Sequence, residues 1–183
     1  MKQMPKPLKT TLHISEVSNT AANTLAYLIR GANIDVATRF GLTPENCPKH
    51  PSLCQAAWVM ADFARGERYF LAQTETGTLG CVAFELAGAG VAYLNRLSVL
   101  PSQQRQGVGQ ALVQHTIALA RTQGIKEISI GVIGAHTDLQ RWYLRMGFVP
   151  GATRDFSHLP FSVHYMTYAV TAEREIQPSL PTK

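Results

Sequence analysis

Seven consecutive residues carry the residue types and spacing best suited to binding an anionic ligand. They are Gln104, Arg105, Gln106, Gly107, Val108, Gly109 and Gln110. Glycine has no Cβ, so backbone at Gly107 and Gly109 can approach a ligand closely, and free amides at a helix N-terminus attract anions. Gln104 and Arg105 add side-chain donors at the same place. The stretch therefore predicts a loop that holds a diphosphate.

Two familiar phosphate-binding loops are excluded by the neighbouring residues. The Walker loop requires Gly-Lys-Ser/Thr, which does not follow here, and the dinucleotide fingerprint requires a third glycine where this chain has Leu112. The remaining pattern is Gln-x-x-Gly-x-Gly at positions 104, 107 and 109. A glycine-bearing helix start can also serve packing alone, so a purely structural loop stays open as an alternative.

A strand and a helix must hold this loop in place. Tyr93–Leu100 alternates as a half-buried strand does, and Pro101 ends it because proline has no N–H for the ladder. Val108–Arg121 has a helical pattern, with Gly124 at the expected C-cap. Three antiparallel strands are predicted to lead into the loop, and a fourth, parallel strand to follow the helix as a crossover requires. These strands span 68–73, 79–86, 90–100 and 127–132.

The ends of the chain give weaker patterns. We expect a first strand over Thr10–Val17, a helix over Ala21–Arg30 that ends at Gly31, a loop-rich stretch over 34–51, and a helix over Leu53–Arg65 with Ser52 as N-cap. A last strand is predicted over Phe161–Val170. The polar tail 171–183 contains two prolines and is expected to be loose.

A second informative stretch lies at 135–149. It predicts a helix that ends at Gly147, followed by a return to strand, and it contains Tyr-x-x-x-Gly-Phe at 143, 147 and 148. Together with Gln-x-x-Gly-x-Gly in the same order, this chain resembles the GNAT superfamily of N-acetyltransferases over roughly 11–170. In many members Asn and Ala stand where this chain has His136 and Leu139.

The resemblance implies the fold, which is an α/β (α+β) GNAT fold in one domain, 1–183. Its central mixed sheet is mostly antiparallel, with about six to seven strands, helices on both faces and a splayed parallel strand pair. It also implies the activity: acetyl transfer from acetyl-CoA to a primary amine by direct attack in a ternary complex. Cys81 lies inside a predicted strand, and nothing marks it as an acyl-carrying nucleophile.

The resemblance further assigns roles to individual residues. Backbone amides of the 105–110 loop would hold the pyrophosphate of acetyl-CoA, with Gln104 beside them. The strand backbone at Leu97, Ser98 and Val99 would pair with the pantetheine arm and stabilise the oxyanion. Tyr143 matches the general-acid position, although an aromatic side chain there can also serve packing alone. His136 could donate a hydrogen bond to the cofactor.

The proton acceptor is less well defined. Amines with a pKa near ~10 are mostly charged at neutral pH, so a group must take their proton. Many relatives have a Glu where this chain has Asn95, which cannot accept a proton at neutral pH. Glu85 on the preceding strand is the nearest carboxylate and could act through water, although it could equally face solvent. His136 and His164 are further candidates.

The segment from Cys47 to Cys54 contains residue types that can bind a metal ion. Cys47, His50 and Cys54 could offer soft ligands to zinc, but a closed site needs a fourth ligand and none stands at suitable spacing. We therefore expect no metal. A structural loop is favoured, with a substrate-pocket role for His50 as the alternative.

Composition limits the remaining classes of function. With 45% hydrophobic and 16% charged residues the chain is globular, and it has neither a signal-peptide core nor an apolar run of about 18 residues that would span a membrane. Three cysteines favour a reducing compartment, hence the cytoplasm. The net charge of +5 suits a polyanionic cofactor, and its scattered lysines and arginines argue against nucleic-acid binding.

Two rival functions remain open. A non-catalytic acyl-CoA sensor would use the same fold and bind acetyl-CoA without turnover. A nucleic-acid-binding module would show affinity that falls steeply with salt and is independent of Gly107. The identity of the acceptor amine is left open by the sequence, and a homodimer is possible because sheet edges often pair in this family.

Overall fold

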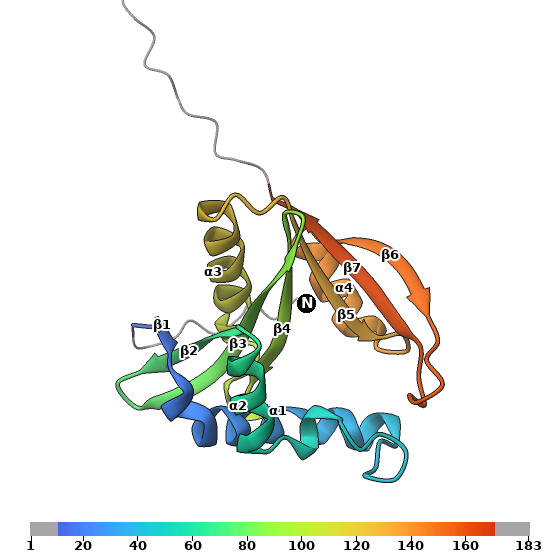
Figure 1. Cartoon of the computed structure of the whole chain (residues 1–183). Coiled ribbons are helices and arrows are strands. Elements are labelled where there is room, and N and C mark those ends of the chain that lie inside the picture. Colours follow the sequence, from blue (N-terminus) through green and yellow to red (C-terminus); the bar gives the residue numbers. More distant parts are fainter. Residues whose placement is uncertain (1–10, 171–183) are drawn as a thin grey trace, which may run out of the picture.

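The computed structural model describes residues 11–170, which form one seven-stranded sheet flanked by helices (Figure 1). The strands run in the spatial order β1-β2-β3-β4-β5-β7-β6. Their bounds are β1 His13–Val17, β2 Arg68–Thr74, β3 Gly77–Gly88, β4 Val91–Val99, β5 Glu127–Ile133, β6 Val149–Arg154 and β7 Val163–Ala169. Thr10 and the predicted loose tail 171–183 lie outside the described residues.

Four α-helices accompany the sheet. They are α1 Ala22–Phe40, α2 Ala56–Ala64, α3 Val108–Thr122 and α4 Thr137–Arg145, with short 3-10 turns at Asn19–Ala21, Pro51–Leu53 and Pro101–Gln103. None of the helices within 11–170 is long and apolar enough to cross a lipid bilayer. The predicted strands and the helices after the loop and before Gly147 are confirmed, with shifts of a few residues at their ends.

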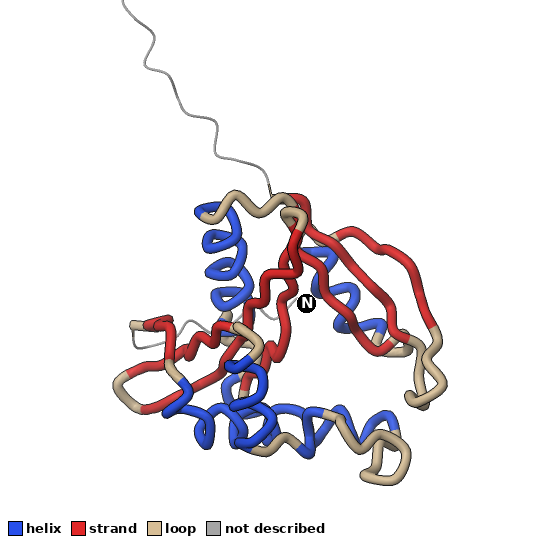
Figure 2. The backbone as a smooth tube through the Cα atoms, in the orientation of Figure 1, coloured by secondary structure: helices blue, strands red, loops and turns tan. Residues whose placement is uncertain are grey.

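The sheet is antiparallel except where β4 meets β5, as predicted. These two strands pair in parallel only over Val91–Tyr93 and Glu127–Ser129, and α3 is the crossover that parallel neighbours require. Beyond this short pairing the two strands diverge, which Figure 2 shows as an opening between the red strand tubes. The expected splayed pair is therefore present at the centre of the sheet.

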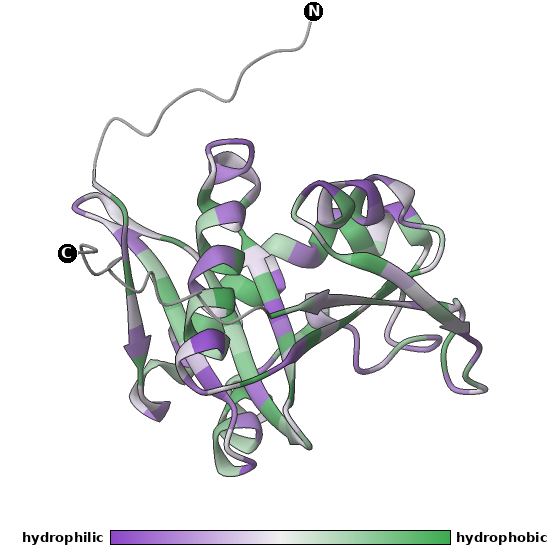
Figure 3. Ribbon diagram, turned by 90° about the horizontal axis from the view of Figure 1, so that it is seen from above, coloured by the Kyte–Doolittle hydropathy of each residue, from purple (hydrophilic) through white to green (hydrophobic). Residues whose placement is uncertain are grey.

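Alternating side chains of the central strands serve two hydrophobic cores, one on each face of the sheet. Phe70, Val82 and Phe84 pack with α3 and α4 on one face. Tyr69 and Ala83, one position away in each strand, pack with α1 and α2 on the other. Figure 3, viewed from above, shows the strongly hydrophobic colouring of these central strands. Helices thus cover both faces.

The first helix is longer than predicted. The sequence pattern suggested that Gly31 ends it, but α1 continues to Phe40 and ends at Gly41, which has the left-handed φ of 61°. The extension is stabilised by tertiary packing, because Ala37 and Phe40 join a small core with Ile133 and Phe161 at the far end of β5 and β7. The prediction that this helix ends at Gly31 was therefore wrong.

The predicted start of the second helix was also wrong, by three residues. Ser52 does not cap it; Ser52 lies in the 3-10 turn Pro51–Leu53, where the imidazole Nδ1 of His50 accepts the Ser52 backbone N–H at 3.2 Å. α2 then begins at Ala56, and Cys54 lies between turn and helix, fully buried. A side-chain cap from His50 stabilises the turn instead of a serine cap on the helix.

We predict opposite effects of alanine at the two glycines of α1. Gly31 is inside the helix, and a Cβ there would lie 3.5 Å from Leu100 Cδ2, an ordinary contact. Gly31→Ala should therefore stabilise the protein by about 0.5–1 kcal/mol. Gly41→Ala should destabilise it by about 1–2 kcal/mol, because alanine disfavours the left-handed conformation. Urea unfolding measures both, and a destabilised Gly31→Ala variant would mean that the helix ends at Gly31.

Candidate active site

A bulge in β4 shapes the centre of the site. Cys81 of β3 pairs with Ser98 and Ala83 pairs with Asn95, so Arg96 and Leu97 together face a single residue of β3. Arg96 takes a φ of 53°, which is uncommon for a residue with a side chain. Because a bulge re-aims side chains, it turns Arg96 toward the α1–α2 face of the sheet, where Asp62 lies.

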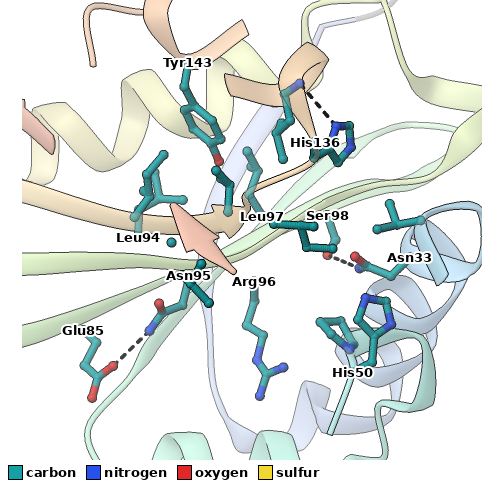
Figure 4. A pocket seen from close by; sticks show the side chains of 18 of the residues that line it. Asn33, His50, Glu85, Leu94, Asn95, Arg96, Leu97, Ser98, His136 and Tyr143 are labelled. Atoms are coloured by element: carbon teal, nitrogen blue, oxygen red, sulfur yellow. Dashed lines mark hydrogen bonds between the residues drawn. The ribbon is translucent and has the colours of Figure 1, made fainter. Parts of the chain in front are cut away.

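A cavity of about 550 Å³ occupies the space that the diverging strands leave open (Figure 4). Its β4 wall comprises Leu94 to Ser98, and its β5 wall comprises Ile130 to Ile133. α4 contributes Leu139 and Tyr143. Asn33 and Val36 come from the part of α1 beyond Gly31, so the unexpected helix extension forms one side of the cavity.

The predicted diphosphate loop forms the N-terminus of α3. Gly107 is the N-cap with a φ of 88°, and Arg105 before it also has a positive φ, 60°. The first helical hydrogen bond is donated by Ala111 to the Gly107 carbonyl at 2.9 Å, so the amides of 108–110 have no acceptor within the helix. The loop thus presents backbone donors at the positive end of the helix dipole.

Two glutamine side chains of the loop serve the loop itself. Gln104 Nε2 donates to the Val99 carbonyl at 3.2 Å and so fastens the loop to the end of β4. Gln106 Nε2 donates to the Ser102 carbonyl at 3.1 Å. Arg105 and Gln110 are exposed. In this arrangement Gln104 and Gln106 shape the cradle, and its donors for an anion are backbone amides.

The two glycines of the loop have different roles. A Cβ at Gly107 would have no atom within 4 Å, so only the positive φ favours glycine there. At Gly109 a Cβ would lie 3.6 Å from both Trp142 and Val99, within ordinary contact. Val108 between them is buried in the core. Gly109 therefore brings α3, α4 and the end of β4 close together.

Tyr143 lies on the opposite side of the cavity from Glu85. Its ring is held edge-on between Trp142 and Phe148, with centroids 4.8 and 5.1 Å away, and it lines the cavity although it is only 4% exposed. Figure 4 shows its hydroxyl directed toward β4. Burial raises the pKa of Tyr143, so the hydroxyl keeps its proton at neutral pH.

His136 is the N-cap residue of α4. Its Nδ1 accepts the Leu139 backbone N–H at 3.4 Å, and its ring packs 5.3 Å from that of Phe40. Burial, with a smaller effect of Arg39, lowers the pKa of His136, so the ring is neutral. With Nδ1 occupied, the neutral ring carries its proton on Nε2, and one donor remains for a ligand in the cavity that His136 lines.

Leu97, Ser98 and Val99 lie beyond the parallel pairing, where β4 has diverged from β5. Leu97 and Ser98 line the cavity, and the Ser98 hydroxyl accepts Asn33 Nδ2 at 3.4 Å from α1. Figure 4 shows this contact as a dashed line. Leu97 and Ser98 are therefore placed at the edge of the cavity, whereas Val99 is not among its lining residues.

The wall near α2 carries several charged residues. The sequence analysis identified one of them, Glu85, which lines the cavity and accepts a hydrogen bond from Asn95 Nδ2 at 2.9 Å. It did not identify the others. Beside Glu85 lie Arg65, Glu67 and Arg96, which also line the cavity. Glu67 has the same parity as Tyr69 and Leu71 on β2, so strand alternation places it on the α1–α2 face; nothing local in the sequence reveals its burial.

The remaining histidine and cysteine candidates have structural partners. His50 is buried and lines the cavity, and burial lowers its pKa. Cys47 and Cys54 are free, buried thiols in different cores. Among residues 11–170 no group of three or more His, Cys, Asp or Glu side chains is arranged to hold a metal ion. His164 bonds the Thr153 hydroxyl at 2.8 Å on the β6–β7 hairpin.

The splayed parallel pair leaves a cavity between its strands, and the N-terminus of α3, which follows β4, has free backbone amides. The model of the acetyltransferase (GNAT) family matches residues 36–148, and the chain belongs to this family. Its members are acetyltransferases that use acetyl-CoA. No curated protein matches the sequence significantly.

Several solved structures share the fold. The ribosomal-protein-S18-alanine N-acetyltransferase from Escherichia coli is 16% identical with a TM-score of 0.71, covering 92% of this chain and 99% of that one. Ard1 from Thermoplasma volcanium is 17% identical with a TM-score of 0.69, covering 87% and 98%. A GNAT-family acetyltransferase from Staphylococcus aureus Mu50 is 16% identical with a TM-score of 0.67, covering 88% and 100%.

We predict that acetyl-CoA stabilises the protein through the loop at the start of α3. At about a hundredfold over its dissociation constant it should add ~2.7 kcal/mol, which raises Tm by roughly 5–11 °C. Gly107→Asp places a negative charge in the cradle and should remove most of that shift. Gly88→Asp is the matched control, since Gly88 has a φ of 84°, open surroundings and a position at the far end of β3. Equal shifts in the two variants would place the cofactor elsewhere.

Proposed function

We propose that this protein is an N-acetyltransferase that moves acetyl from acetyl-CoA to a primary amine by direct attack in a ternary complex. The observation that supports it best is the cavity between β4 and β5, which is lined by the backbone of 97–98 and by Tyr143, and has carboxylates on the opposite wall. Bound acetyl-CoA supplies the thioester carbonyl and the thiolate leaving group. The chain's own residues bind, orient and move protons.

The binding roles follow the geometry already described. The loop amides at 105–110 are proposed to hold the pyrophosphate, with Gln104 fixing the loop to β4. The backbone at Leu97, Ser98 and Val99 pairs with the extended pantetheine arm, and an amide there stabilises negative charge on the carbonyl oxygen. His136 Nε2 donates to the ligand within the same cavity.

The two proton-transfer roles lie on opposite walls. Tyr143 keeps its proton at neutral pH and is proposed to donate it to the departing thiolate. Glu85 lies on the other wall, held by Asn95, so a carboxylate is placed there to attract the ammonium of the acceptor, which loses its proton at this wall directly or through water. An acid and a base separated by the width of the cavity suit attack between them.

We expect Tyr143→Phe to lower kcat on the order of 10²-fold, which is the size of a lost general acid. Phenylalanine keeps the ring packing against Trp142 and Phe148, so the acetyl-CoA-induced rise in Tm should not change. Tyr168→Phe is the matched control, because Tyr168 packs on the other side of Phe148. If Tyr143→Phe retains wild-type kcat, the tyrosine is only a packing residue.

The acceptor class can be found by measuring release of free CoA thiol with four probes. These are spermidine, tyramine, a peptide with a free N-terminal alanine, and an N-acetylated peptide with one lysine. Acetylation of at least one of them, confirmed by mass spectrometry, is the expected result. Binding of acetyl-CoA with no thiol release from any amine would favour the acyl-CoA sensor instead.

Three further proposals concern the protein as a whole. Residues 1–183 form a single domain with the core at 11–170. The protein works in the cytoplasm, which the free, buried thiols of Cys47, Cys54 and Cys81 support. As to partners, neither a nucleic acid nor a membrane is expected, and two copies are proposed to pair by a sheet edge as a homodimer, which light scattering would detect.

A further inference from the structure

A cluster of buried charges lies beneath the acceptor wall of the cavity. Asp62, from α2, is 2% exposed, and Glu67, between α2 and β2, is 5% exposed. Two arginines, Arg65 and Arg96, reach the same place, and Tyr69 lies in the core below. Carboxylates are rarely this buried unless they are paired, so the partners of each oxygen show what each one does.

Both carboxylate oxygens of Asp62, Oδ1 and Oδ2, have side-chain donors. Arg65 Nη2 lies 2.6 Å from its Oδ1, and the Tyr69 hydroxyl donates to its Oδ2 at 2.6 Å. Arg96 Nη2 lies 3.3 Å from the same Oδ2. These donors leave little room for another partner. Asp62 therefore organises the wall and is not free to take a proton from a substrate.

Glu67 is different. Arg65 Nη2 donates to its Oε1 at 2.8 Å, but its Oε2 is buried and has no hydrogen-bond partner. Glu67 lines the cavity. A buried carboxylate oxygen without a partner costs stability, which is tolerated in native structures where the group has another use. The unused oxygen is a position for an N–H donor from a bound ligand.

A second carboxylate of the cavity wall, Glu85, lies on the neighbouring strand β3. Arg68 of β2 pairs with Phe84 of β3, so Glu67 and Glu85 are the next positions along the two antiparallel strands and project to the same face. Asn95 holds Glu85 in place from β4 by its 2.9 Å hydrogen bond. Figure 4 shows the hydrogen bond between Asn95 and Glu85, with the side chain of Arg96 extending from the next position of β4.

The charges around Glu67 come from every neighbouring element. Asp62 and Arg65 approach from α2 and its end, Glu85 from β3, Arg96 from β4, and Tyr69 from β2. Burial is the largest influence and raises the pKa of Glu67, and the negative charges of Asp62 and Glu85 raise it further. Arg65 and Arg96 oppose them without reversing the shift. A carboxylate of raised pKa is a better proton acceptor.

We propose that Glu67 is the group that takes the proton from the acceptor amine, while Glu85, held by Asn95, is a positioning residue that attracts the ammonium. This inference rests on the proposed acetyl transfer. The substrate enters as R–NH₃⁺ and gives one proton to Glu67 Oε2, which becomes a neutral carboxylic acid. The free amine then forms the C–N bond and the C–S bond breaks. Tyr143 protonates the thiolate, the second amine proton returns through water to the Tyr143 phenolate, and Glu67 gives its proton to the solvent.

The proposal is tested with Glu67→Gln, Glu85→Gln and the control Glu75→Gln, which lies in the exposed β2–β3 turn. The pH profile of kcat/KM is measured with the amine of highest turnover among the four probes. Glu67→Gln should lower kcat on the order of 10²-fold and remove the acidic limb. Glu85→Gln should keep that limb and move it to lower pH, because a neighbouring negative charge has been removed.

Further readouts keep the outcomes distinct. The acetyl-CoA-induced rise in Tm should be the same in all variants, and Glu67→Asp should recover part of the activity through a shorter carboxylate. If Glu67→Gln retains wild-type kcat and the same acidic limb, the assignment of Glu67 is wrong while acetyl transfer stands. If the wild type binds acetyl-CoA but acetylates none of the four amines, the proposed function fails and this inference fails with it.

The titration of Glu67 should also appear in stability. A carboxyl whose pKa is raised on folding contributes stability below its unfolded pKa and loses it as the pH rises through the folded pKa. Glu67→Gln cannot lose that contribution, so its Tm relative to wild type should increase as the pH rises from 4 to 8. Glu75→Gln should show no such trend. A flat difference for Glu67→Gln would mean that folding does not raise the pKa of Glu67.

Discussion

The short pairing of β4 with β5 is the constraint on which the site depends. A parallel pair that stays together only over Val91–Tyr93 and Glu127–Ser129 leaves the rest of both strands with unpaired edges. Exposed backbone donors and acceptors at such an edge are a binding surface, because an extended ligand can supply the missing hydrogen bonds. The cavity, the loop at the start of α3 and Tyr143 are all arranged around this opening.

The bulge at Arg96 determines which side chains of β4 border the opening. A regular β4 would alternate strictly, and Asn95 and Arg96 would lie on opposite faces. With the extra residue, Arg96 reaches Asp62 beneath the acceptor wall, while Leu97 lines the cavity. The carboxylates Glu67 and Glu85 line the cavity near Arg96, while the free amides of 108–110 lie at the start of α3, beyond the end of β4.

The sequence predicted the parts that depend on local pattern. Alternation and turn residues identified the strands, and Gly107, Gly124 and Gly147 marked helix ends because each has a left-handed φ. The second half of α1 was missed because its helical signal is weak and its stability comes from contacts with Ile133 and Phe161, about a hundred residues away. Glu67 was missed for the same reason, since its burial depends on α2 and β3, and one glutamate in a sequence resembles any other.

The length of α1 has a mechanical consequence. At 1.5 Å per residue its 19 residues span about 28 Å, from the core under β2 and β3 to the core at the end of β5 and β7. Its last turn is fastened to the start of α4 by the Arg39–Asp138 ion pair and the Phe40–His136 ring contact. The two halves of the sheet are joined at the centre by three residue pairs, and α1 connects them across the open side. Separating the two halves further would require α1 to bend or detach, so these contacts limit how far the opening between β4 and β5 can widen.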